Sequence, residues 1–575
     1  MTNLTNMTTK PSRSTMKLPP NLDAACWDQL APLYAQLNGR QISSAKDLEQ
    51  LILDRSDLDA AADEAQANLY IAMTCHTNDD ARRGAFLKFV QDVEPNLRTT
   101  GAELDRKIVE SPFAKQLDAK RYETYLRAMR QEVRLFRAEN VPLQTEATTF
   151  DQEYSKICGA MSVTFDGKEQ TMPQMARYAE STDRSVREES WTVVSARRLR
   201  DRDEIDGIYD KLISLRHRMG LNAGFNDYRD FQHERMLRFD YKPADCKKFH
   251  QAIEETCVPL MRDLHRQRAK ALGLKTLKPW DLKVDLRGRQ PLRPFADTTQ
   301  LIERTSRAFH RLDAELGVMF DSMRTGSCLD LETRPGKAPG GYQYQRQQSR
   351  LPFIFMNAAG LQRDLTTMVH EAGHAFHSLL SKNDPILAYR GSPIEFAEVA
   401  SMSMELLTFP QLDEFYTEEE SARARRDQLE GLATLLPWVA TIDAFQHWVY
   451  TNPGHTRAQR SAHWVELNDR FGGDVDWSGN EETLASLWHR QLHLFGSPFY
   501  YVEYGIAQLG ALQMWRQARR DPKAALANYK RALALGGSRP LPDLFTSAGL
   551  TFDFGPETVR GLMEEVQTEL ASIPA

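Results

Sequence analysis

The stretch MVHEAGHAFHSLL, residues 368–380, combines ionisable side chains with the apolar pattern of a buried helix. Its apolar residues recur at spacings of three and four, which predicts a hydrophobic stripe along one side of an α-helix. His370 and His374 then lie one turn apart on another side, where two imidazoles can reach the same metal ion. Because apolar interiors reject unpartnered ionisable groups, these residues need a partner. The H-E-x-x-H pattern predicts that this partner is zinc, with Glu371 as the general base.

A catalytic zinc ion needs three protein ligands and one open position for water, so the two histidines require a third partner. The zinc-protease pattern with a third histidine after a further glycine fails, because His377 and Leu380 occupy those two positions. A second helix is predicted over 390–407, RGSPIEFAEVASMSMELL. Its Glu398 lies among apolar neighbours, where an unpaired carboxylate would be costly. We therefore expect Glu398 to be the third ligand.

Two other glutamates of this helix receive different interpretations. Ser392 has the position of an N-cap and Pro393 that of the first helical residue, so Glu395 fits the third position of a capping box. Glu405 lies two turns beyond Glu398 on the same side of the helix. It could orient a ligand histidine from outside the metal's own ligand set, or it could form an ordinary salt bridge.

Length and composition indicate a globular chain with two or more subdomains. The chain has 575 residues, of which 41% are hydrophobic and 26% charged, and its net charge is −6. This charge gives no bulk electrostatic reason to expect nucleic acid or an anionic membrane as a partner. The first twenty residues lack the apolar core of a signal peptide, and no apolar run approaches membrane-spanning length. Six scattered cysteines suggest buried thiols rather than a disulfide framework, so we expect a cytoplasmic protein.

The chain reads as mainly helical. We expect a disordered tail over 1–20, an N-terminal helical subdomain over 21–200 and a catalytic domain over 201–575. The exception is 334–357, where the alternating runs YQYQ and LPFIF predict two strands of a small sheet.

The glycines before the first of these strands suggest a contact with substrate. An exposed edge strand can pair with an extended peptide through backbone hydrogen bonds, and Gly340 and Gly341 would permit close approach beside Tyr342. An ordinary hairpin with a flexible turn explains the same residues equally well.

A tyrosine-rich helix is predicted after Ser497-Pro498, within residues 490–510. Tyr501 and Tyr504 are three positions apart and share a side of this helix. A phenol can donate a hydrogen bond to the oxyanion that develops during peptide hydrolysis. Aromatic residues at helical spacing are also typical of simple core packing.

Several segments together resemble one protein family. HEAGHAFHS, EFAEVASMSMEL and SPFYYVEYGIAQLGALQMW resemble the oligoendopeptidase F/thimet oligopeptidase family of zinc metallopeptidases, nearest to bacterial oligoendopeptidases of the Pz-peptidase type. The likeness is strongest over 275–555. It implies a mainly α fold in which two helical halves enclose a deep central channel, with a small β-hairpin or sheet near the active site. It also implies one zinc ion at the floor of that channel.

The resemblance assigns roles residue by residue. The implied zinc ligands are His370, His374 and Glu398, with Glu371 as the general base. Tyr504 is the main oxyanion donor in this interpretation, and Tyr501 contacts a peptide carbonyl or carboxylate. A substrate-binding histidine corresponds to His493, although the variable spacing to the tyrosines keeps His489 as an alternative.

We therefore expect a zinc-dependent endopeptidase that hydrolyses internal bonds of short peptides, as a monomer or small homo-oligomer. One alternative is an exopeptidase that releases C-terminal dipeptides, which needs a charged clamp for the terminal carboxylate that the sequence does not locate. Another is a non-catalytic peptide-binding scaffold, which would have no need for both a base and oxyanion donors.

Overall fold

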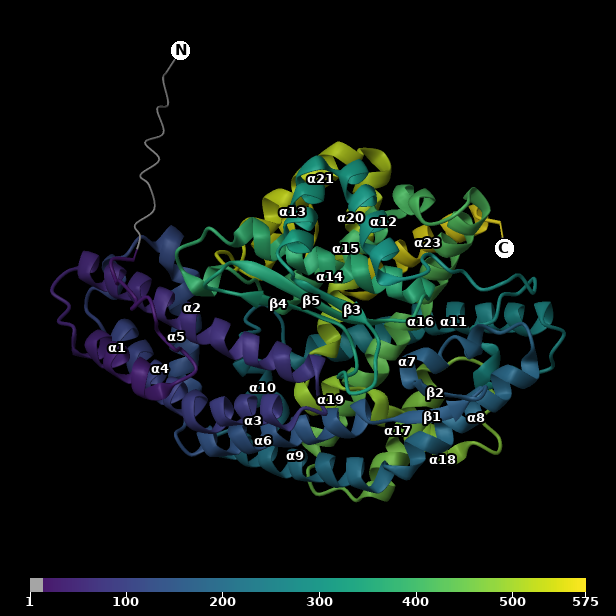
Figure 1. The fold of residues 1–575 in the computed structure, drawn as a ribbon, viewed down its shortest axis with the longest axis horizontal. Helices are drawn as coiled ribbons and strands as arrows, with labels where there is room; N and C mark the ends of the chain where they lie inside the picture. The colour runs from purple at the N-terminus through teal and green to yellow at the C-terminus, as the bar shows by residue number, and fades with distance from the viewer. Residues whose placement is uncertain (1–13, 575) are drawn as a thin grey trace, which may run out of the picture.

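The computed structural model describes residues 14–574, and over these residues the fold is mainly helical, as predicted (Figure 1). The α-helices of the N-terminal half are α1 (Trp27–Gly39), α2 (Ala45–Cys75), α3 (Asp80–Lys88), α4 (Glu94–Val109), α5 (Ala119–Leu135), α6 (Asn140–Gly159), α7 (Met172–Met175), α8 (Arg184–Arg200), α9 (Arg202–Asn222), α10 (Tyr228–Arg235) and α11 (Pro243–Ala271). Those of the C-terminal half are α12 (Thr298–Leu312), α13 (Ala314–Thr325), α14 (Gln362–Ser381), α15 (Ile394–Leu407), α16 (Glu418–Thr451), α17 (Arg457–Phe471), α18 (Glu481–Ala485), α19 (His493–Gly496), α20 (Tyr501–Arg520), α21 (Pro522–Leu533), α22 (Leu541–Ser547) and α23 (Pro556–Ser572).

The sheet predicted from the alternating runs is present and has one more strand than expected. Strand β4 (Tyr342–Arg346) pairs antiparallel with β5 (Leu351–Ala358), and β3 (Leu329–Glu332) pairs parallel with β5 on its other side. The order is therefore β3–β5–β4, with β4 at one edge. A separate hairpin joins β1 (Ser162–Phe165) to β2 (Lys168–Thr171). This hairpin is not among the predicted elements, although the four residues of β1, SVTF, alternate polar with apolar side chains.

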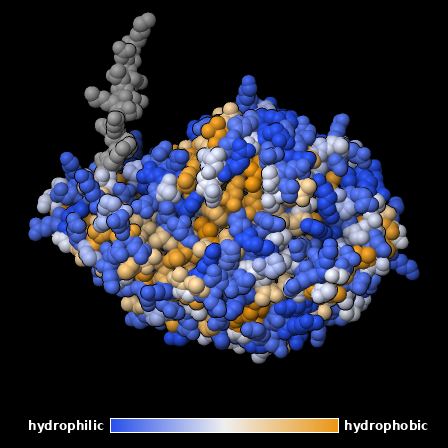
Figure 2. Space-filling model, viewed as in Figure 1, coloured by the Kyte–Doolittle hydropathy of each residue, from blue (hydrophilic) through white to orange (hydrophobic). Residues whose placement is uncertain are grey.

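Helices α14, α15 and α20 pack in series beside the three-stranded sheet. Strand β5 leads into α14, which packs against α15, and α15 packs against α20. Gly373 of α14 allows the first contact, since a Cβ atom there would lie 2.6 Å from Ser401 Cα. In Figure 1 the sheet crosses the middle of the molecule, with α14, α15, α20 and α21 above it and α6, α9 and α17 below. Hydrophobic residues gather near the middle of the same face (Figure 2).

The start of the described chain differs from the predicted disordered tail. The backbone N–H of Thr15 donates to Asp54 Oδ1 at 2.7 Å, and Met16 and Leu18 pack against an apolar cluster built mainly from residues 24–129. The prediction is therefore wrong for residues 14–20, because buried Asp54 supplies acceptors that fix this segment; residues 1–13 lie outside the described part. At the predicted domain boundary only Asp201 separates α8 from α9, and that boundary stays a prediction. Among the described residues, no helix combines the length and apolarity needed to cross a bilayer.

Candidate metal centre and active site

Helices α14 and α15 bring the three expected metal ligands together. Glu398 Oε2 lies 3.3 Å from His370 Nε2 and 3.4 Å from His374 Nε2. Two ligands about 2.0–2.1 Å from a tetrahedral zinc ion stand about 3.3 Å apart, so these separations fit that ion. The nitrogen and oxygen donors also suit zinc. We conclude that the geometry of His370, His374 and Glu398 fits the metal that the sequence predicted.

Outer residues orient these ligands. Glu405 Oε1 lies 2.7 Å from His370 Nδ1, so His370 donates from Nδ1 and keeps the Nε2 lone pair for a metal. Gln428 Nε2 in turn donates to Glu405 Oε2 at 3.0 Å. The Tyr500 hydroxyl donates to Glu398 Oε1, which leaves Oε2 turned towards the histidines. Glu405 therefore contacts His370, one of the expected ligands, and its orienting role stays a prediction.

Glu371 has the surroundings of a general base. Its side chain is buried beside the ligand set, and its Oε2 atom has no hydrogen-bond partner among the described residues. Burial raises the pKa of Glu371 above the usual glutamate value, while neighbouring His370 and His374 act in the opposite direction. The backbone N–H of Gln343 on β4 also favours the charged form. One carboxylate oxygen is therefore free to accept a proton.

The edge strand β4 approaches this base closely. A Cβ atom on Gly341 would lie 3.5 Å from Glu371 Oε1 and 3.1 Å from Thr367 Cγ2, so glycine permits the contact between β4 and α14. Gly340, with φ of 90°, turns the chain into this strand. Tyr342 stacks on Phe355, with ring centroids 4.6 Å apart.

Side-chain amide atoms of two glutamines on β4 lack hydrogen-bond partners among the described residues. Gln343 Nε2 and both side-chain polar atoms of Gln345 are buried without a hydrogen-bond partner among the described residues. Buried polar groups normally have partners, so these atoms call for one from outside the chain or from ordered water.

The two candidate histidines of the tyrosine segment lie in different surroundings. His493 Nε2 lies 3.1 Å from the Tyr504 hydroxyl, whereas His489 packs on Trp488 and faces Asp206, 3.5 Å away. His493 is therefore the one beside Tyr504. Burial lowers the pKa of His493 to about 4, so its imidazole is neutral near pH 7. Burial likewise raises the pKa of Tyr504 well above its usual value, so the phenol keeps its proton.

Tyr501 makes a different contact from the expected one. Its hydroxyl donates to Gln491 Oε1 at 2.9 Å. The segment between His493 and the tyrosines is anchored from below by buried Arg216, which donates to the carbonyl of Leu494 at 2.8 Å. The role of Tyr501 as a contact for a peptide carbonyl or carboxylate stays a prediction.

The predicted capping box at the start of α15 is wrong. The helix begins at Ile394 with Pro393 as N-cap and no side-chain cap. Glu395 instead accepts a hydrogen bond from the Tyr241 hydroxyl at 2.6 Å, within the protein interior. A carboxylate buried beside a long-range tyrosine satisfies its oxygens there, and the sequence between the two gives no signal of the contact.

Sequence reasoning also missed Tyr500 and Gln491. Tyr500 precedes the Tyr501–Tyr504 pair as the N-cap residue of α20, and its hydroxyl bonds Glu398 on another helix. No helical spacing rule could reveal this. Gln491 carries no motif, although a polar residue two positions from a candidate histidine is a weak signal.

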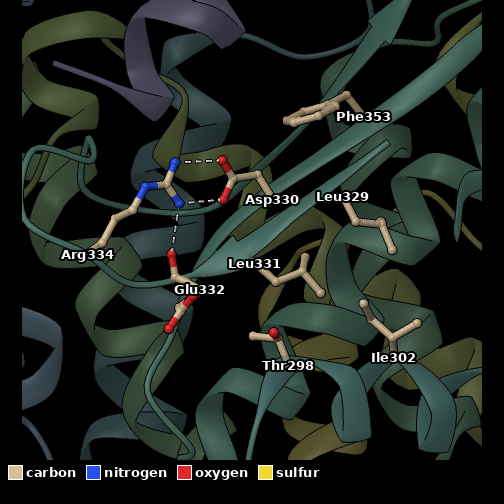
Figure 3. A pocket seen from close by; sticks show the side chains of 8 residues that line it. All are labelled: Thr298, Ile302, Leu329, Asp330, Leu331, Glu332, Arg334 and Phe353. Atoms are coloured by element: carbon tan, nitrogen blue, oxygen red, sulfur yellow. Dashed lines mark hydrogen bonds and ion pairs between the residues drawn. The ribbon is translucent and has the colours of Figure 1, made fainter. Parts of the chain in front are cut away.

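A pocket at the opposite edge of the sheet belongs to a different region. Figure 3 shows it at β3, with Arg334 and Asp330 joined by two hydrogen bonds of 2.7 and 2.8 Å. None of the expected metal ligands lines this pocket. Arg334 and Asp330 are already paired with one another, so this pocket offers neither a free base nor a set of metal ligands.

The mainly helical fold and the close spacing of His370, His374 and Glu398 are consistent with a metal-dependent peptidase. A sequence model of Peptidase family M3 matches residues 177–562, and one of the Peptidase M3 N-terminal domain matches residues 23–136. The chain therefore belongs to peptidase family M3, whose members are metallopeptidases.

Individual relatives agree with this assignment. A structure of Pz peptidase A with an inhibitor is 27% identical, with a TM-score of 0.92, and covers 95% of this chain and 98% of that one. An oligoendopeptidase F homolog from Borreliella burgdorferi is 24% identical over 56% of both chains. Oligopeptidase PepF from Bacillus subtilis is 25% identical over 42% of this chain. The matches span 56% and 36% of these two relatives' own lengths.

Proposed function

We propose that this chain is a zinc-dependent oligopeptidase that hydrolyses internal bonds of short peptides. The observation that carries the proposal is the unpartnered Oε2 of Glu371 beside three ligand atoms spaced for one ion. A scaffold that only bound peptides would have no use for a buried, free base at this position.

The residues divide the reaction between them. A zinc ion held by His370, His374 and Glu398 would polarise the scissile carbonyl and make water more acidic. Glu371 accepts the proton of the attacking water at Oε2 and later delivers it to the leaving amine. The Tyr504 hydroxyl donates a hydrogen bond to the developing oxyanion, and such a donor is worth roughly 10²–10³ in rate.

Strand β4 supplies the substrate contact in this proposal. Its outer edge faces Glu371, and its unpartnered Gln343 and Gln345 amides suit a peptide laid alongside as an added strand. Backbone pairing at Gly340, Gly341 and Tyr342 would hold peptides of varied sequence. Short peptides, one zinc ion and the absence of nucleic-acid or membrane partners complete the proposal, for a cytoplasmic monomer or small homo-oligomer.

Endopeptidase activity is favoured over release of C-terminal dipeptides. Backbone pairing along β4 reads neither terminus of a peptide, so it places internal bonds at the base. An exopeptidase would require a positive group fixed beside the site for the terminal carboxylate.

An internally quenched peptide with acetylated and amidated ends tests the proposal. Wild-type protein should cleave it, a chelated sample should not, and zinc should restore cleavage. Glu371→Gln should bind zinc and leave the peptide intact. Cleavage of only the free-ended version, two residues from its C-terminus, would replace the proposal with the exopeptidase; an inert wild type that carries zinc would replace it with the scaffold.

A further inference from the structure

Gln491 is a buried residue whose side-chain amide has three polar neighbours. Its Oε1 atom lies 3.2 Å from Trp438 Nε1 and 2.9 Å from the Tyr501 hydroxyl. Its Nε2 atom lies 2.8 Å from His493 Nδ1. His493 Nε2 continues the chain to Tyr504, 3.1 Å away.

Trp438 fixes the direction of each hydrogen bond in the series that runs from Gln491 through His493 to Tyr504. An indole N–H can only donate, so the amide atom that faces Trp438 must be the oxygen. The NH₂ group of Gln491 therefore faces His493 and donates to Nδ1. A neutral imidazole that accepts at Nδ1 carries its proton on Nε2.

The tautomer decides what Tyr504 can do. His493 donates from Nε2, so the Tyr504 oxygen accepts this bond and its own proton points elsewhere. With the other tautomer, Nε2 would be an acceptor, and the Tyr504 hydroxyl would donate its hydrogen bond to His493. The oxyanion would then lose its donor, although every side chain stayed in place.

We propose that Gln491 is a positioning residue that holds His493 in its Nε2–H tautomer and thereby keeps the Tyr504 proton available for the oxyanion. This inference rests on the proposed function and extends it by a residue that touches neither the substrate nor the metal ligands. Trp438 acts one step further out, because it prevents the amide of Gln491 from turning over.

A double-mutant cycle with Tyr504 tests the inference. Gln491→Met keeps the length of the side chain and removes both hydrogen-bonding groups. It should lower kcat roughly 10- to 100-fold, less than the 10²–10³-fold cost of losing an oxyanion donor outright, with KM and bound zinc little changed. In a Tyr504→Phe background the same substitution should cost almost nothing further, because no phenol proton remains to be directed.

Two further variants make the result decisive. Gln513→Met removes another buried glutamine, which bonds the backbone of Thr551 at 3.0 and 2.9 Å, and should leave kcat unchanged. Trp438→Phe keeps a ring but no N–H, so it should lower kcat less than Gln491→Met and again only when Tyr504 is present; this pair decides the matter if Gln491→Met does not fold.

An unchanged kcat in Gln491→Met, or losses that persist undiminished in the Tyr504→Phe background, would overturn the inference. A wild-type protein that cleaves no peptide would instead refute the proposed function, so the two failures are distinguishable.

Discussion

Two buried clusters in this molecule contain similar residues and have different surroundings. His370, His374 and Glu398 lie between α14 and α15, while Cys246, Asp443 and His447 lie between α11 and α16. In each cluster the possible ligand atoms lie within 4.8 Å of one another. Residue types and proximity therefore do not separate a reactive centre from a structural one.

Partners and access separate the two clusters. The ligand histidines of α14 retain 17% and 15% of their side-chain exposure, whereas Asp443 has none. Asp443 Oδ2 also lies 2.7 Å from His250 Nε2, so this carboxylate oxygen already has a hydrogen-bond partner outside the cluster. We interpret the α11–α16 cluster as a structural contact between these helices, because Asp443 is fully buried and bonded to His250. We interpret the α14–α15 cluster as the reaction centre, because its two histidines stay partly exposed beside the unpaired Oε2 of Glu371.

The largest effect on activity is expected at the base. Glu371→Gln removes the proton acceptor without touching a ligand, so kcat should fall by about 10³-fold or more, within the range of general acid–base catalysis. Zinc measured on the same sample should stay at the wild-type amount. Activity within tenfold of wild type would show that another group takes the proton.

A somewhat smaller effect is expected at the phenol. Tyr504→Phe should lower kcat by roughly 10²–10³-fold with little change in KM, since the lost bond forms only in the transition state. Tyr500→Phe is the matched control, because the Tyr500 hydroxyl bonds Glu398, an expected zinc ligand. Added zinc should partly restore the activity lost in Tyr500→Phe and should not restore that lost in Tyr504→Phe. Equal responses of the two variants to zinc would contradict these separate roles.

The outer partner of the metal centre should show a moderate effect. Glu405→Gln weakens the hydrogen bond that orients His370, and such partners are commonly worth about 10–100-fold in metal affinity. Titration with a zinc-buffered competitor should show this loss, and kcat at saturating zinc should stay close to wild type. An unaltered affinity would mean that Glu405 is an ordinary ion-pair partner.

The structural cluster should affect stability and leave activity almost unchanged. Asp443→Asn removes the charged acceptor of a buried hydrogen bond from His250 and should lower the free energy of unfolding by about 2 kcal/mol. Burial disfavours the charge, yet His447 and His250 hold the pKa of Asp443 below its usual range, and burial lowers that of His250. The unfolded state thus binds more protons in acid, and wild-type stability should fall below about pH 6.5. Denaturant unfolding of Asp443→Asn should show a similar fall between about pH 6.5 and 4, where unfolding lets His250 bind a proton, and a shallower fall below about pH 4, where the Asp443 contribution is missing.

The same contrast explains what the sequence could predict. HExxH follows local helical geometry, and the apolar neighbours of Glu398 together with the family resemblance pointed to a third carboxylate; the structure brings these three side chains close together. The contact of α14 with α15 also left a signal, the glycine of HEAGH, whose missing Cβ admits Ser401. The two strands β4 and β5 were long enough to show alternation.

Long-range partners gave no comparable signal. Tyr241 takes Glu395 away from the helix start, and Asp54 orders the segment at Thr15, across separations that no local pattern records. The Tyr500 hydroxyl bonds Glu398, and Phe499 just before it has a positive φ. These contacts depend on packing between distant helices, which tertiary structure alone reveals.

The most direct test is to measure bound metal and peptide cleavage together on wild type, His374→Ala and Asp443→Asn. We expect one zinc per wild-type chain, its loss together with activity in His374→Ala, and retention of both in Asp443→Asn. Zinc and cleavage that survive His374→Ala, or that disappear with Asp443→Asn in folded protein, would contradict the assignment of the reaction centre to α14 and α15.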